Sequence, residues 1–68
     1  MKLSARNQLK GKVVDVVKGA TTAHVKIELP GGAIVTASIT NDAVADLSLA
    51  KGDQVVAVIK ASDVMVGK

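Results

Sequence analysis

The alternation of apolar and polar residues along the 68-residue chain indicates β structure almost throughout. The clearest strand runs from Thr22 to Leu29, where the apolar residues share one face: Ala23, Val25, Ile27 and Leu29. Pro30-Gly31-Gly32 then predicts a hairpin turn, because glycine adopts the positive φ angles that such turns require. A third strand is predicted from Ala33 to about Thr40, with an apolar face and a hydroxyl face.

Two other segments are rich in valine and apolar on both faces, as expected of strands that are covered on two sides. The first runs from Leu9 to Lys18, and its broken alternation predicts either two-sided burial or a bulge near Asp15. The second runs from Gln54 to Ile59, after a turn at Lys51-Gly52-Asp53. A last short strand is predicted from Val64 to Val66.

A short helix interrupts the strands. Thr40-Asn41-Asp42 is typical of a helix start, because side-chain oxygens there accept hydrogen bonds from the free N–H groups of the first turn. The helix would continue from Ala43 to about Leu47, with Val44 and Leu47 on one side. About five short strands with one short helix predict an all-β fold, a small OB-like Greek-key barrel that forms a single domain over residues 1–68.

The small size of the chain limits its stability. A domain of this length buries only about 60% of the surface that its unfolded chain exposes. The chain has no cysteine for disulfides or thiolate zinc sites, and a single histidine, His24. Because 49% of the residues are hydrophobic, we expect subunits to cover one another in a homo-oligomer.

Charge and composition limit the classes of partner that the chain is expected to bind. Nine basic against six acidic residues give a net charge of +3, enough to attract anions. There is no Phe, Tyr or Trp on which bases could stack, so we expect no nucleic-acid partner. No apolar run suggests a signal peptide or a membrane span, so we expect a cytoplasmic protein without a membrane partner. Scattered carboxylates and one strand histidine give no support for an enzyme.

Two segments carry polar chemistry that a barrel does not need. Ser4-Ala5-Arg6-Asn7-Gln8 precedes the first strand, and Lys60-Ala61-Ser62 follows the long apolar fourth strand. If these segments meet, they form a pocket of donors suited to a deprotonated tetrahedral anion. Spacing alone favours the simpler interpretation, a solvated arginine and a solvated lysine.

The run from Ser4 to Val14, together with the run from Ala57 to Val66, resembles the molbindins, the molybdenum-pterin-binding-protein family, across essentially the whole chain. This family shares its domain with the TOBE regions of molybdate transport ATPases and molybdate-responsive regulators. The resemblance implies a bound molybdate or tungstate and a hexamer, a trimer of dimers, with anion sites at the subunit interfaces. It implies a role in storage and homeostasis.

The resemblance also implies site residues. The anion would be held by Ser4, Ala5, Arg6, Lys60, Ala61 and Ser62, with Thr40 from a neighbouring subunit. Ala43 replaces a serine of some relatives, so that contact is expected to be lost. A second site is assigned to Lys18, Gly19, Thr21 and Thr22, although the two threonines are equally compatible with ordinary strand residues. Two rival functions remain open, an OB-like nucleic-acid-binding module and a regulatory subunit that senses the anion.

Overall fold

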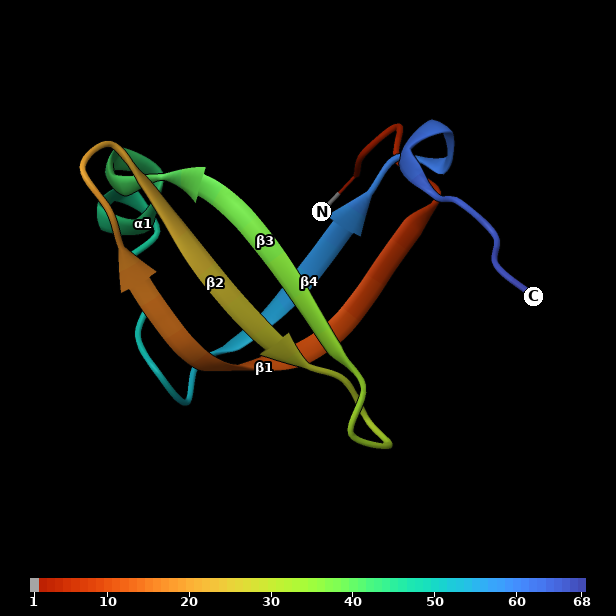
Figure 1. Cartoon of the computed structure of the whole chain (residues 1–68), viewed down its shortest axis with the longest axis horizontal. Coiled ribbons are helices and arrows are strands. Elements are labelled where there is room, and N and C mark those ends of the chain that lie inside the picture. The colour runs from red at the N-terminus through yellow and green to blue at the C-terminus, as the bar shows by residue number, and fades with distance from the viewer. Residues whose placement is uncertain (1) are drawn as a thin grey trace.

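The computed structural model describes residues 2–68, which form one curled antiparallel sheet with a short helix at one end (Figure 1). The strand order is β3-β2-β1-β4. The elements are β1 (Asn7–Lys18), β2 (Thr22–Glu28), β3 (Ile34–Thr40), α1 (Asn41–Asp46), β4 (Gln54–Ile59) and the 3₁₀ turn η1 (Ala61–Asp63). Within residues 2–68, no helix has the length and apolar character needed to cross a bilayer.

The long strand β1 has two different neighbours along its length. From Lys12 to Lys18 it pairs with β2, and from Asn7 to Lys12 it pairs with β4. The register with β2 shifts between Val13 and Asp15, which confirms the predicted bulge. A bulge bends its strand and increases its twist, so β1 can leave β2 and continue with β4 alone.

The buried core lies on the concave face of the sheet. Every second residue of β2 is buried, as its alternation predicted. The core residues are Val13, Ala23, Val25, Ile27, Val44 and Ala57. The predicted helix start is confirmed, because the Thr40 hydroxyl accepts a hydrogen bond from the Ala43 N–H at 3.0 Å. The helix predicted to end at about Leu47 is confirmed, because α1 ends at Asp46 with Leu47 as its C-cap; Val44 is buried, whereas Leu47 is 66% exposed.

The OB-like all-β class is confirmed, but the sheet has four strands that curl into a half-barrel (Figure 1). The fifth strand predicted at Val64–Val66 is wrong for the described chain, where these residues follow η1 as irregular backbone. Met65 and Val66 are each 94% exposed. A strand requires a paired edge as well as apolar residues, and the tail runs outward from the sheet.

Candidate oxyanion site

The pairing of β1 with β4 brings the two candidate donor segments together. Asn7 is the register partner of Ile59, so Arg6 and Lys60 each stand one residue beyond the last paired position. Directly opposed residues in an antiparallel pair lie ~4.5–5.5 Å apart between Cα atoms. The first and the late polar segments are therefore neighbours at one end of the half-barrel, although 54 positions separate them in sequence.

Two side-chain amides hold these segments in place. The Asn7 Nδ2 donates to the carbonyl of Ile59 at 3.2 Å, directly beside Lys60. The Gln8 Nε2 donates to the carbonyl of Ala5 at 3.3 Å, and Ala5 itself is buried. These contacts fix the backbone on both sides of the pair. Asn7 and Gln8 belong to the first donor segment but had no predicted role: the Asn7 contact depends on the β1–β4 register, and the Gln8 contact depends on the local backbone before β1.

The side chains at this end are suited to holding an anion. Arg6, Lys60 and the hydroxyls of Ser4 and Ser62 are all exposed, and all of them can donate hydrogen bonds. Lys60 is the extended residue that precedes η1, whose first N–H groups have no carbonyl within the turn to donate to. Asp63 ends the turn, where its own N–H donates to the Lys60 carbonyl at 2.9 Å. This end therefore offers two cations, two hydroxyls and free backbone N–H groups.

Thr40 lies at the opposite end of the molecule. It pairs with Thr22 at the far end of the β2–β3 ladder, where α1 begins. β1 has 12 residues, and a strand rises ~3.3 Å per residue, so the two ends are tens of ångströms apart. Figure 1 shows the same separation between α1 and the segment that follows β4. Thr40 and Arg6 of one chain therefore cannot contact the same anion.

The residues of the predicted second site lie beside Thr40, in the turn between β1 and β2. The Gly19 N–H donates to the Thr22 carbonyl at 2.7 Å, which closes the turn. Asn41 ties the turn to α1, because its Nδ2 donates to the Gly19 carbonyl at 3.0 Å and its N–H to the Thr21 carbonyl at 2.9 Å. Lys18, Gly19, Thr21 and Thr22 thus form one structural unit with Thr40. Sequence reasoning did not find the contribution of Asn41.

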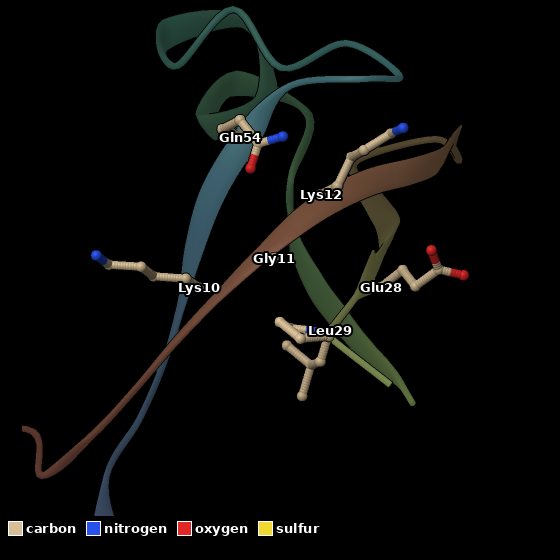
Figure 2. Close-up of a pocket in the computed structure, with 7 residues that line it drawn as sticks. Lys10, Gly11, Lys12, Glu28, Leu29 and Gln54 are labelled. Atoms are coloured by element: carbon tan, nitrogen blue, oxygen red, sulfur yellow. The ribbon is translucent and has the colours of Figure 1, made fainter. Parts of the chain in front are cut away.

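A groove of about 250 Å³ opens where β2 ends and β1 continues with β4 (Figure 2). Lys10, Gly11 and Lys12 lie along its β1 wall. The two lysine side chains point away from each other, so the groove does not gather their charges on one ligand. The end of the molecule that carries Arg6 and Lys60 remains the better candidate for an anion site.

Comparison with known proteins places the chain in a family. Residues 3–66 match the model of the TOBE domain. Molybdenum-pterin-binding protein 3 of Clostridium pasteurianum is 53% identical over 66 residues, which cover 97% of each chain. A molybdate-binding protein from Sporomusa ovata superposes with a TM-score of 0.94 at 43% identity, over the whole of both chains. ModG, described as a cytoplasmic molybdate-binding protein and solved with molybdate bound, gives a TM-score of 0.92 at 46% identity; the match covers 96% of this chain and 46% of ModG.

The chain folds as an OB-like half-barrel, and its residues 3–66 match the TOBE model, so it is a TOBE domain. At 53% identity over nearly its whole length, the chain belongs to the family of molybdenum-pterin-binding proteins. The family is one of binding proteins.

Proposed function

We propose that this chain binds molybdate or tungstate at the end formed by Arg6 and Lys60. The observation that supports the proposal is the Asn7–Ile59 pairing, which makes Arg6 and Lys60 neighbours along the backbone at the joined ends of β1 and β4. The relatives that bind molybdate support the identity of the anion. In this proposal Ser4, Ala5, Arg6, Lys60, Ala61 and Ser62 form the site.

The chemistry of the donors fits a tetrahedral dianion. Arg6 and Lys60 neutralise its two charges, while hydroxyls and backbone N–H groups fix its orientation. A hydrogen bond to a charged partner contributes about 1.5–3 kcal/mol. Several such bonds, less the cost of binding, reach about −8 kcal/mol, which corresponds to a micromolar Kd. Sulfate carries the same charge, so discrimination against it depends on the size of the cavity.

The surface of the chain supports binding sites shared between subunits. Its accessible surface is 5244 Å². A compact monomer of 6.9 kDa exposes about 4,000 Å². The excess is larger than the roughly 800 Å² that each partner buries in a standard interface. The chain thus exposes as much extra surface as a subunit of an oligomer would. We propose a homohexamer, a trimer of dimers, in which Thr40 of a neighbour completes the site at Arg6 and Lys60.

Storage and homeostasis of the oxyanion in the cytoplasm, without catalysis, is the physiological role that we propose. Reversible binding needs no nucleophile or general base, and His24 and the carboxylates form no cluster of three or more metal-ligating groups among the described residues. The turn of Lys18, Gly19, Thr21 and Thr22 is proposed as the second anion site. It lies next to Thr40, so the assembly would place both sites near subunit contacts.

Elemental analysis of the natively purified protein, combined with native mass spectrometry, tests this function. We expect molybdenum or tungsten in fixed proportion to subunits, and a mass of six chains. A protein that contains neither metal and binds no added molybdate in calorimetry would contradict the proposed site. Salt-dependent shifts of oligonucleotides in a gel would favour a nucleic-acid-binding module instead.

A further inference from the structure

The two donor segments contain one carboxylate, to which the proposed site gives no role. Residues 2–8 and 59–68 carry the cations Lys2, Arg6, Lys60 and Lys68, and their only acidic residue is Asp63. Asp63 is exposed and directly follows Ser62, one of the proposed donors. A negative charge at this position opposes the binding of an anion.

Three other carboxylates have a partner within the sheet or its loops: Asp15 lies opposite Lys26, Glu28 lies opposite Lys12, and Asp53 accepts a hydrogen bond from the Ala50 N–H at 2.9 Å. Opposite charges on neighbouring strands stabilise a sheet. Asp63 has no place in the sheet, because the pairing of β4 with β1 ends at Ile59. The charge nearest to it along the chain is that of Lys60.

The backbone of η1 holds Asp63 beside Lys60. The Asp63 N–H donates to the Lys60 carbonyl at 2.9 Å, and this bond closes the turn. Such a turn keeps the Cα atoms of its first and fourth residues within about 7 Å of each other. Lys60 carries its ammonium on a flexible chain of carbons, so the ammonium can reach either the Asp63 carboxylate or an anion at the site. Arg6 joins the same end, because β1 pairs with β4 as far as Asn7 and Ile59 (Figure 1).

A carboxylate this close to the site changes the affinity for an anion by a measurable factor. Two unit charges about 4 Å apart in water change an equilibrium constant about fivefold, and a dianion about 8 Å from a carboxylate has the same effect. Salt reduces the repulsion, since the screening length is about 10 Å at 0.1 M and about 3 Å at 1 M. The repulsion is proportional to the charge of the anion, so a monoanion meets half the free-energy penalty of a dianion.

We infer that Asp63 is an internal counterion of the proposed anion site. While the site is empty, its carboxylate pairs with the Lys60 ammonium. When a dianion binds, the ammonium turns to the anion and the carboxylate repels it. The inference rests on the proposed function and deepens it, because it assigns the residue that limits affinity. A protein that stores an oxyanion must also release it, and this carboxylate keeps the site from binding too tightly for release.

The charge of Asp63 is tested in the full chain by calorimetry with tungstate in about 0.1 M salt. Asp63→Asn removes the charge and nearly keeps the shape, so it should lower the tungstate Kd about fourfold. Asp63→Glu keeps the charge and should lose most of that gain.

Glu28→Gln is the matched control, because it also removes one negative charge. Glu28 lies opposite Lys12, which stands about 20 Å along β1 from Arg6. This distance is about two screening lengths at 0.1 M salt, so the tungstate Kd of the control should change less than about 1.5-fold.

Perrhenate separates an effect of charge from an effect of structure. It is a tetrahedral monoanion of nearly the same size as tungstate, and its affinity is measured by competition with tungstate. A purely structural effect of Asp63→Asn would change both affinities equally. Repulsion by charge predicts a gain of about twofold for perrhenate where tungstate gains about fourfold. In 1 M salt the gain for tungstate should fall below about 1.5-fold.

The outcomes separate the two proposals. The counterion is overturned if Asp63→Asn binds tungstate with unchanged or lower affinity, if it gains equally for both anions, or if Glu28→Gln gains as much. Each of these results leaves the proposed anion site standing. A natural chain that binds neither tungstate nor molybdate overturns the anion site, and the counterion with it.

Discussion

Arg6 and Lys60 differ in what they offer an anion, although each carries one positive charge. The guanidinium presents a planar fork of N–H groups, whereas the ammonium is a compact, strongly hydrated charge. A tetrahedral oxyanion can accept two parallel bonds from the fork, which fixes its orientation as well as its charge. We therefore expect the larger loss of affinity at Arg6.

Arg6→Ala should weaken molybdate binding tenfold or more in calorimetry, and Arg6→Lys should recover only part of that loss. Lys60→Ala should weaken binding too, and should reduce the rise in Tm that molybdate produces. Both residues are exposed, so the free energy of unfolding without the anion should change little. Lys10→Ala, which removes one charge from the middle of β1, is the control. Equal affinity for Arg6→Ala and Lys10→Ala would remove Arg6 from the site.

Asn7 is a positioning residue, because its amide holds the Ile59 carbonyl beside Lys60. Asn7→Ala should raise the molybdate Kd about three- to tenfold, as expected when one hydrogen bond of ~0.5–1.5 kcal/mol is lost. It should also speed amide hydrogen exchange in η1, which a change in net charge alone would not do. Asn7→Asp keeps the shape but cannot donate, so it should behave at least as poorly. Unchanged exchange in η1 would show that the contact does not order the donors.

At the scale of elements, the path of β1 decides where the site lies. The strand must pass very close to β2 before it continues with β4, and Gly11 makes that approach possible. A Cβ at Gly11 would lie 2.6 Å from Ile27 Cγ2 and 2.8 Å from the carbonyl oxygen of Glu28. The second contact is with backbone, which cannot move aside as a flexible side chain does.

Gly11→Ala should therefore lower the free energy of unfolding by about 1–3 kcal/mol, the usual cost of overpacking. Urea denaturation at one fixed protein concentration measures the change, since an oligomer's stability depends on concentration. Gly67→Ala is the matched control, because its new Cβ has no atom within 4 Å. A Gly11→Ala protein as stable as the control would mean that the two strands separate easily here.

Sequence patterns predicted correctly those structural features that depend on residues close to one another in the sequence. The alternation in β2, the bulge before Asp15 and the cap at Thr40 depend on residues close in sequence. The strand predicted at 64–66 is absent, because apolar residues alone indicate a strand but pairing also requires the free edge of another strand. For the same reason, Arg6 and Lys60 could be proposed as candidates from sequence, but the Asn7–Ile59 register that makes them neighbours could not be predicted.

At the scale of the whole molecule, the chain has the properties of an incomplete unit. Its Cα radius of gyration is 12.3 Å. A compact chain of this length has about 11 Å. Val13 is its largest fully buried side chain. A core this small supplies a few kcal/mol at most, so in the proposed assembly we expect neighbours and anion together to stabilise the fold.

Thr40 and Arg6 lie at opposite ends of one subunit, so in the proposed assembly two differently damaged variants should complement each other. Arg6→Ala damages one pole of the subunit, and Thr40→Asp damages the other: an aspartate still caps α1 but repels the anion. Each variant alone should have only weakened shared sites, at least tenfold poorer in affinity. Refolded together in equal amounts, they should regain about one intact site in four, because random mixing pairs two undamaged poles that often. Equilibrium dialysis of molybdate counts these revived sites, and a mixture no better than its components would place Thr40 outside them.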